Sequence, residues 1–143
     1  MKRTESMTQI ILASHGSLSH GLLNTLSMII GDPGENVRAY SLVPGENPRD
    51  FLKELETEIT GSSDQYIILT DIQGGSVHTA LSELVNCPNV LLIAGMNLPL
   101  ALEILTRYRD GIRETEYAGL VESSRLGISL LHHGLTEAAD EEF

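Results

Sequence analysis

The sequence predicts an α/β fold: a doubly wound, mainly parallel four-stranded sheet in the order 2-1-3-4, with helices on both faces. Four short apolar segments alternate along the chain with longer segments whose apolar residues recur at helical spacing. This alternation is typical of parallel strands joined by right-handed helical crossovers. With 143 residues the chain has the size of one domain, which we place at residues 8–133, between an extension at 1–7 and an acidic tail at 134–143.

The first two pairs of strand and helix are expected at residues 8–13 with 18–30, and at 37–43 with 48–60. The first segment, TQIILA, is too short for a buried helix and indicates a buried strand. The helix that follows has one apolar stripe, which stops before a glycine. The second helix begins at Asn47-Pro48, where a capping side chain precedes a proline at the first helical position.

The last two pairs are expected at residues 66–70 with 76–85, and at 90–94 with a helix after Pro99. A final helix is predicted over residues 116–131. The two glycines inside that segment weaken the prediction, because each costs about 1 kcal/mol in a helix relative to alanine.

Charge and composition exclude several classes of function. Acidic residues outnumber basic ones by 20 to 9, and the formal net charge of −11 would repel both nucleic acids and anionic membrane surfaces. The longest apolar run, residues 90–96, is far shorter than the roughly 20 residues of a membrane-spanning helix. With one cysteine the chain can form no disulfide within itself, so we expect a protein of the reducing cytoplasm.

Two candidate catalytic residues follow neighbouring strands of the predicted sheet. Open parallel sheets bind ligands beyond the carboxyl ends of their strands, near the point where the strand order reverses. His15 follows the first strand and Asp71 the third, and neighbouring strands lie about 4.8 Å apart, so we expect these side chains to meet. A carboxylate that holds one imidazole nitrogen leaves the other unprotonated and able to attack an electrophile.

Gly74, Gly75 and Ser76 lead from the loop after Asp71 into a predicted helix. Glycines let the backbone approach a ligand closely, the start of a helix carries partial positive charge, and the serine adds a hydroxyl donor. These three residues are candidates for binding an anion such as a phosphoryl group. The chain has no P-loop motif for a nucleotide, and we expect neither a cofactor nor a metal.

The other histidines have simpler explanations. His20 lies in the first predicted helix and is expected at its surface, and His132 and His133 are expected as solvated residues near the carboxyl end of the last helix. His78 lies beside the candidate anion site and could contact a substrate or partner. A rival interpretation is a metal-dependent hydrolase that uses His78 together with the candidate catalytic pair.

These residues, in this order, resemble the mannose-family IIA domain of the bacterial phosphoenolpyruvate-dependent sugar phosphotransferase system. The likeness spans about residues 9–108 and rests on four short segments, each at the carboxyl end of a predicted strand. The segments are Ser14-His15-Gly16, Val43-Pro44-Gly45-Glu46-Asn47, Thr70-Asp71 through Gly74-Gly75-Ser76, and Ala94-Gly95-Met96-Asn97-Leu98-Pro99. Four such matches with the expected spacing are far more specific than any one of them.

The resemblance implies a phosphotransferase that relays a phosphohistidine. On the family pattern His15 accepts a phosphoryl group from the phosphocarrier protein HPr and passes it to a histidine of a IIB domain, during sugar uptake by membrane IIC and IID subunits. Asp71 would hold the ring, and the amides around Gly74, Gly75 and Ser76 would bind the phosphoryl oxygens. The resemblance also implies a homodimer, in which an extra antiparallel strand is exchanged between the two copies.

Some positions depart from the family pattern. Family members commonly have a proline after the serine of the glycine segment and an asparagine two residues beyond it, whereas this chain has Val77, His78 and Thr79. His78 is therefore a candidate for the rim of the site, together with Ser14 and Asn97. Two alternatives remain open on the same scaffold: a regulatory or protein-binding module, and the phosphoryl-donor subunit of dihydroxyacetone kinase.

Overall fold

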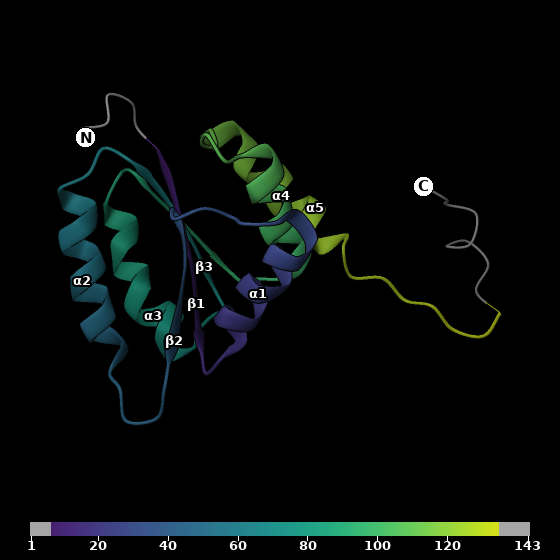
Figure 1. Ribbon diagram of the computed structural model, residues 1–143, viewed down its shortest axis with the longest axis horizontal. Coiled ribbons are helices and arrows are strands. Elements are labelled where there is room, and N and C mark those ends of the chain that lie inside the picture. The colour runs from purple at the N-terminus through teal and green to yellow at the C-terminus, as the bar shows by residue number, and fades with distance from the viewer. Residues whose placement is uncertain (1–6, 135–143) are drawn as a thin grey trace.

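The computed structural model describes residues 7–134, in which helices surround a parallel sheet (Figure 1). The sheet has four strands in the order β2-β1-β3-β4, and all three neighbouring pairs are parallel. The strands are β1 (Thr8–His15), β2 (Val37–Leu42), β3 (Gln65–Thr70) and β4 (Val90–Ala94). The predicted fold class and strand order are therefore confirmed.

Helices cover both faces of the sheet (Figure 1). One face carries α1 (Leu18–Ile30), α4 (Leu98–Arg107) and α5 (Tyr117–Arg125), and the other carries α2 (Pro48–Thr60) and α3 (Ser76–Leu81). Two short 3-10 helices, η1 (Ser82–Asn86) and η2 (Glu114–Glu116), follow α3 and precede α5. Within the described range, no helix combines the length and the apolar character needed to span a membrane.

The central strand β1 contributes to the cores on both sides of the sheet. Ile10 and Leu12 pack with α1 and α4, whereas Ile11 and Ala13 pack with α2 and α3. All four side chains are at most 1% exposed. Burial on both faces explains why the strand is a continuous apolar run, and burying one Ile or Leu side chain contributes about 1.5–3 kcal/mol. The packed strand holds its carboxyl end, at His15, in a fixed place.

Two asparagines fix the starts of the helices that follow β2 and β4. The Asn47 side chain accepts a hydrogen bond from the backbone N–H of Arg49 at 3.0 Å, which caps α2. The Asn97 side chain accepts from the N–H of Leu100 at 2.8 Å, which caps α4. A cap of this kind typically contributes about 1 kcal/mol. Both helices therefore begin at defined positions beside the strand ends.

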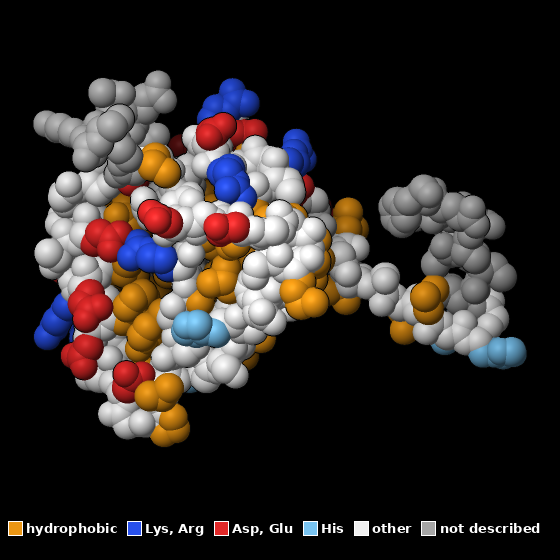
Figure 2. Space-filling view, in the orientation of Figure 1, with side chains coloured by type: hydrophobic (Ala, Val, Ile, Leu, Met, Phe, Trp, Pro, Cys, Tyr) orange, Lys and Arg blue, Asp and Glu red, His pale blue; other side chains and the backbone are white. Residues whose placement is uncertain are grey.

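Acidic side chains gather on the outer surface of α2. This helix contributes Asp50, Glu54, Glu56 and Glu58, and Figure 2 shows acidic groups along the part of the surface that α2 occupies in Figure 1. The inward side chains of the same helix, Leu52, Leu55 and Ile59, are buried. The helix thus presents acidic groups to solvent and apolar groups to the sheet.

The final helix is shorter than the sequence predicts. A helix is predicted over residues 116–131, but α5 ends at Arg125. Gly127 follows in a turn, and a Cβ atom there would lie only 2.6 Å from Cγ of Pro99. The backbone therefore packs directly against the start of α4, a tertiary contact that helical spacing does not reveal. This part of the prediction is wrong.

Two further predictions differ from the structure in detail. The helix predicted over residues 76–85 is α-helical only to Leu81 and continues as the 3-10 helix η1. His132 and His133 are exposed, as expected, but they lie beyond α5 and not at a helix end. Most of the predicted extension and acidic tail, at residues 1–6 and 135–143, lies outside the described residues.

Candidate functional site

His15 and Asp71 meet at the carboxyl ends of β1 and β3. The register of these strands places Ala13 opposite Thr70, so both loops leave the same edge of the sheet. Nδ1 of His15 lies 2.7 Å from Oδ2 of Asp71, and the backbone N–H of His15 donates to the same oxygen at 2.8 Å. The prediction that these two side chains meet is confirmed.

The carboxylate of Asp71 determines where the His15 ring carries its proton. Burial raises the pKa of Asp71. Hydrogen bonds from the backbone and ring of His15 and from the N–H of Ile72 together lower it by more, so the pKa lies below its usual value. An ionised carboxylate can only accept hydrogen bonds, so Nδ1 of His15 must carry the proton. In the neutral ring Nε2 then keeps its lone pair.

The free nitrogen of His15 points toward the start of α3. Nε2 lies 3.0 Å from the hydroxyl oxygen of Ser76, and because Nε2 has no proton, the hydroxyl donates this hydrogen bond. The His15 side chain is 47% exposed, whereas the Asp71 side chain is 11% exposed. The His15 side chain is therefore accessible, with Nε2 beside a hydroxyl group that can rotate, while its partner carboxylate is largely buried.

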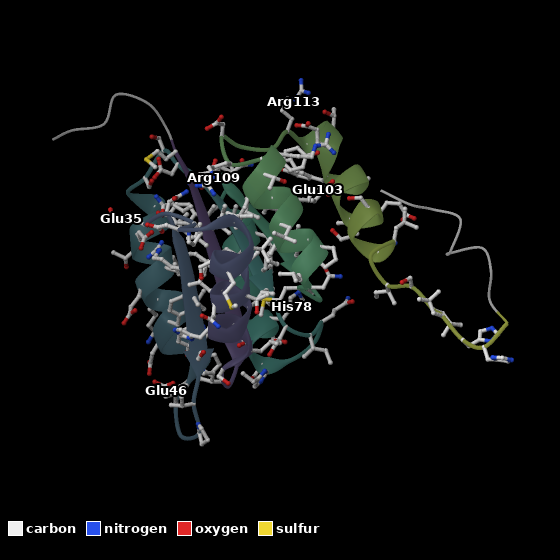
Figure 3. The ribbon with its side chains drawn as sticks, turned by 45° about the vertical axis from the view of Figure 1, so that its right-hand side comes forward. Glu35, Glu46, His78, Glu103, Arg109 and Arg113 are labelled. Carbon is white, nitrogen blue, oxygen red and sulfur yellow. The ribbon has the colours of Figure 1, made fainter. Side chains whose placement is uncertain are left out.

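The glycines before α3 allow a close approach to the His15 ring. A Cβ atom on Gly75 would lie 3.3 Å from Cε1 of His15 and 2.8 Å from Cγ2 of Ile72. Gly74 has a φ of +82°, which favours glycine. In this structure the N–H of Gly74 donates to Nδ1 of His78 at 3.2 Å, and the N–H of Gly75 donates to the carbonyl of Ile72 at 3.2 Å. His78 lies on α3 and is labelled in Figure 3. Two of the predicted anion-binding amides thus already have partners within the protein.

Ser14, a predicted rim residue, is buried beneath the loop that follows His15. Its side chain is fully buried, and its hydroxyl donates to the carbonyl of Gly16 at 3.2 Å and accepts from the N–H of Ser19 at 2.8 Å. These bonds join the end of β1 to the first turn of α1. Ser14 therefore supports the loop that carries His15 and does not line the surface of the site.

Asn97 and His20 lie near the same edge of the sheet. The Asn97 side chain caps α4 and also donates to the carbonyl of Ser124 at 3.3 Å, so it joins α4 to α5. His20 is exposed on α1, as predicted, and its Nδ1 pairs with the hydroxyl of Ser41. Both side chains thus hold local structure together.

A hollow of about 360 Å³ opens beside His15. Besides His15 and Gly16, the lining consists of Leu42 and the loop from Val43 to Glu46. This loop is one of the four segments that follow the strand ends. A partner that approaches His15 would meet the loop after β2 at the same time.

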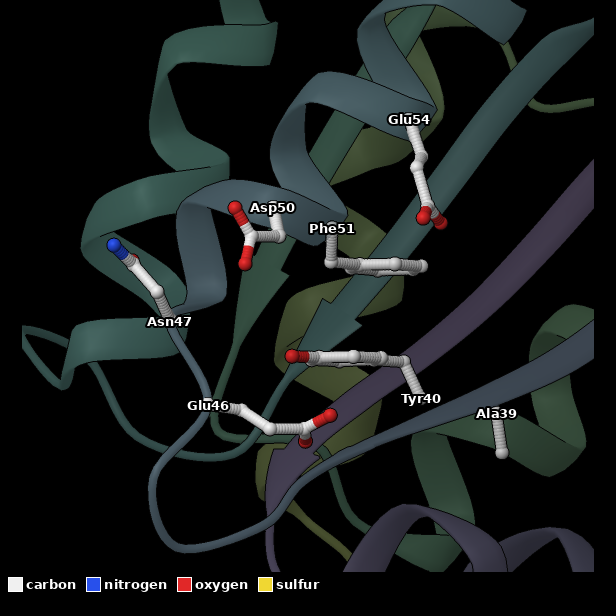
Figure 4. Close-up of a pocket in the computed structure, with 7 residues that line it drawn as sticks. All are labelled: Ala39, Tyr40, Glu46, Asn47, Asp50, Phe51 and Glu54. Atoms are coloured by element: carbon white, nitrogen blue, oxygen red, sulfur yellow. The ribbon is translucent and has the colours of Figure 1, made fainter.

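A second hollow, of about 260 Å³, lies between β2 and α2 (Figure 4). The rings of Tyr40 and Phe51 stack within it, with centroids 3.9 Å apart and planes at 2°. Burial, together with the carboxylates of Glu46, Asp50 and Glu54, raises the pKa of Tyr40. Sequence reasoning missed this hollow, because a strand and a helix supply the two rings and no local pattern signals their stacking. Glu46 lines both hollows.

The described residues contain no evident metal-binding group. Between residues 7 and 134, no three His, Cys, Asp or Glu side chains are grouped so that they could hold a metal ion. His15, Asp71 and His78 therefore do not form a three-ligand set, and Nδ1 of His78 instead faces the amide of Gly74. The geometry gives the hydrolase interpretation no support.

Comparison with known proteins assigns the family. The family profile described as "EIIA-man: PTS system fructose IIA component" matches residues 9–117. The chain belongs to this family. This IIA component is also similar to the "PTS system sorbose-specific EIIA component" of Klebsiella pneumoniae, with 36% identity over 101 residues that cover 69% of this chain and 73% of the relative.

Solved structures of phosphotransferase-system proteins resemble this IIA component. The PTS IIA protein associated with the fucose utilization operon from Streptococcus pneumoniae superposes with a TM-score of 0.75 and 29% identity, covering 90% of this chain and 96% of that one. Component EIIA from Streptococcus agalactiae gives a TM-score of 0.73 and 25% identity, covering 86% and 96%. The resemblance stated from sequence is confirmed: this is a mannose-family IIA component of a sugar phosphotransferase system.

Proposed function

We propose that His15 of this IIA component accepts a phosphoryl group from the phosphohistidine of HPr and passes it to a histidine of a IIB domain. The observation that carries this proposal is the fixed tautomer of the ring. Asp71 accepts a hydrogen bond from the protonated Nδ1 at 2.7 Å, which leaves the lone pair on Nε2 of a half-exposed ring. A neutral imidazole nitrogen held in this way is a prepared nucleophile.

In the transfer, Nε2 of His15 attacks the phosphorus atom of the donor phosphohistidine. The new N–P bond forms as the donor's N–P bond breaks, and the electron pair of the broken bond returns to the donor ring. The proton stays on Nδ1, hydrogen-bonded to Asp71, whose negative charge stabilises the positive charge that develops on the His15 ring. Transfer to the IIB domain is the same displacement with His15 as the leaving group. Positioning and electrostatics therefore account for most of the catalysis.

Ser76 changes its hydrogen-bond acceptor during this step. Its hydroxyl donates to Nε2 of His15 before the transfer, so it must turn away when that lone pair attacks phosphorus. The same hydroxyl can then donate to a phosphoryl oxygen, together with amides of the segment from Gly74 to Ser76. Neutral donors hold the phosphoryl group less tightly than a cluster of lysines or arginines would, which suits a relay that must release it.

Exposed apolar side chains beside His15 support a protein partner. Val43 lines the hollow that contains His15, and Ile72 directly follows Asp71; they are 49% and 61% exposed. Apolar groups around a reactive residue are typical of a docking surface. We infer that HPr and the IIB domain bind this face in turn, in the cytoplasm, and that the membrane IIC and IID subunits act only indirectly on this chain.

The edge of the sheet supports the proposed homodimer. β4 is an edge strand in the order β2-β1-β3-β4, and an unpaired edge favours pairing with another strand. Beyond α5, Leu126, Ile128 and Leu130 are 74%, 80% and 75% exposed, and their two-residue spacing is typical of a strand. We propose that this segment is the strand exchanged between two copies. Ile128→Asp should shift the molecular mass in light scattering from dimer to monomer, and a wild-type monomer would contradict the proposal.

Phosphorylation of His15 can be tested by intact mass after incubation with phosphoenolpyruvate, enzyme I and HPr. We expect the gain of one phosphoryl group that is labile in acid, and no gain for His15→Ala. His20→Ala is the matched control, because His20 is exposed near the same edge of the sheet and should be dispensable. A wild-type protein that stays unmodified with active donors would overturn the proposal.

Onward transfer separates the relay from a regulatory module. The phosphorylated protein, purified from its donor, should lose the phosphoryl group within seconds to minutes when a cognate IIB domain is added, and the IIB domain should gain it. A phosphorylated protein that keeps its group in the presence of every IIB domain encoded beside it would favour the regulatory alternative.

A further inference from the structure

His78 makes a hydrogen bond that has a definite direction. Its Nδ1 lies 3.2 Å from the backbone nitrogen of Gly74. An amide N–H can only donate, so Nδ1 of His78 must be the acceptor and must be unprotonated. In this arrangement the His78 ring is neutral and carries its proton on Nε2. The bond joins the first turn of α3 to the glycine loop that lies beside the His15 ring.

The partner of His78 is one of the donors that the proposed phosphoryl transfer requires. Gly74 and Gly75 precede Ser76, whose hydroxyl lies 3.0 Å from Nε2 of His15. The N–H of Gly75 is engaged by the carbonyl of Ile72 within the turn. The N–H of Gly74, in contrast, is held by a side chain, which can move without unfolding the turn. Of these two amides, the one on Gly74 is therefore easier to release.

We propose that His78 is a positioning residue that occupies the Gly74 amide in the unphosphorylated protein and yields it to a phosphoryl oxygen when His15 is phosphorylated. This inference rests on the proposed function of His15. His78 then does for the Gly74 amide what Ser76 does for Nε2: each satisfies a polar group at rest and is displaced when the phosphoryl group arrives. The hydrogen bond between Gly74 and His78 thus stabilises the unphosphorylated protein relative to the phosphorylated one.

The size of the effect follows from the strength of one hydrogen bond. The net contribution of a hydrogen bond between neutral groups corresponds to about a 2- to 12-fold change in an equilibrium constant. Removing the acceptor at position 78 should therefore raise the equilibrium constant for phosphorylation of His15 by about this factor. His78 would thus keep the phosphohistidine reactive toward the next acceptor.

Two substitutions distinguish the effect of the hydrogen-bond acceptor at position 78 from the effect of its planar ring. His78→Phe keeps a planar ring and removes the acceptor. His78→Asn places its side-chain oxygen close to the former position of Nδ1 and so keeps an acceptor for Gly74. The phosphorylated fraction of each variant should be measured at equilibrium with a fixed ratio of phosphorylated to free HPr. A pH of about 8.5 is well above the usual imidazole pKa of about 6.5, so a positively charged ring does not contribute.

We expect the phosphorylation constant of His78→Phe to exceed that of the wild type by about 2- to 12-fold, and that of His78→Asn to match the wild type. If the wild type is phosphorylated and the phosphorylation constant of His78→Phe is equal to or below that of the wild type, the role of His78 is overturned while the function of His15 stands. If the wild type is not phosphorylated at all, the proposed function fails and this inference fails with it.

Nuclear magnetic resonance gives a second readout that does not depend on transfer. A scalar coupling across the hydrogen bond between the amide nitrogen of Gly74 and Nδ1 of His78 should be present in the unphosphorylated protein. It should disappear on phosphorylation of His15. A coupling that is absent from the free protein, or that persists in the phosphorylated one, would contradict the displacement of His78.

Discussion

The ring of His15 lies 2.7 Å from the carboxylate of Asp71, although 56 residues separate them in the chain. One oxygen of Asp71 accepts from both the ring and the backbone N–H of His15, and the other accepts from the N–H of Ile72 at 2.8 Å. Three donors on one carboxylate fix its plane, and the plane fixes the orientation of the ring. The His15 ring is thus held in position by the protein itself.

Asp71→Asn should keep the fold and slow the phosphorylation of His15 by about 10- to 100-fold. A hydrogen bond to a charged group contributes about 1.5–3 kcal/mol, and an asparagine that turns its NH₂ group toward Nδ1 would also favour the wrong tautomer. Initial rates of mass gain with HPr as donor measure the effect. Asp32→Asn, in the loop before β2, is a control that should react at the wild-type rate. A rate for Asp71→Asn within about twofold of the wild type would refute the orienting role.

The same carboxylate should contribute to stability in a defined range of pH. The folded pKa of Asp71 lies below its unfolded value of about 3.9, so its contribution is complete above that value and is lost as the pH falls through the folded pKa. The difference in the free energy of unfolding between wild type and Asp71→Asn should therefore shrink below about pH 4. Urea unfolding followed by circular dichroism measures it. A difference that stays constant down to pH 2 would show that Asp71 gains nothing from these hydrogen bonds.

Gly75→Ala should impair phosphorylation by crowding its neighbours, including the carbonyl oxygen of Ile72 at 3.3 Å, and not through an unfavourable φ. Gly75 has a φ of −70°, which any residue adopts, but a Cβ atom would crowd Cγ2 of Ile72 at 2.8 Å and Cε1 of His15 at 3.3 Å. Moving a side chain off its rotamer costs about 0.5–1.5 kcal/mol, so we expect a rate about 2- to 12-fold lower.

The control for this substitution is Gly21→Ala. No atom outside the helix lies within 4 Å of a Cβ at Gly21, which is inside α1. This change should stabilise the protein by up to about 1 kcal/mol and leave the rate of phosphorylation unchanged. Equal rates for the two variants would show that the close contact at Gly75 does not position the His15 ring.

The sheet could be predicted because its strands have local patterns, and the pair of His15 and Asp71 could be predicted because the expected strand order makes β1 and β3 neighbours. Residues 8–13 and 66–70 are short, mainly apolar runs that are typical of buried strands. The strand order then places the residues that follow them, His15 and Asp71, at one edge of the sheet. The Asn47-Pro48 helix start is equally local, since the cap and the proline act within one turn.

The features that sequence reasoning missed depend on contacts between different elements of the fold. Gly127 packs on Pro99, which ends α5 early, and Tyr40 stacks on Phe51 from another element. Ser14 follows an apolar run and looks like a surface residue, yet its hydroxyl is buried because the first turn of α1 supplies its donor. Spacing along the chain does not encode such contacts.

A final prediction concerns a hydrogen-bond network on the face of the sheet that α2 covers. The Tyr66 hydroxyl donates to Oε2 of Glu58 at 2.6 Å, and Arg38 donates to both oxygens of Glu58. The hydrogen bond from Arg38 lowers the pKa of Glu58, although burial opposes this. Burial and the bond to Glu58 raise the pKa of Tyr66 to about 12. The neutral phenol is therefore favoured by folding.

Because folding raises the pKa of Tyr66, its contribution to stability changes only at alkaline pH. A group whose pKa is raised by folding contributes fully below its unfolded pKa, about 10 for tyrosine, and loses its contribution as the pH rises through the folded value, about 12. The gap in unfolding free energy between wild type and Tyr66→Phe should be constant from pH 7 to 9 and should narrow above about pH 10. Urea unfolding in this range tests it, with Tyr117→Phe as a control. Because Tyr66 is remote from His15, Tyr66→Phe should be phosphorylated at the wild-type rate, which separates this stabilising network from the proposed relay.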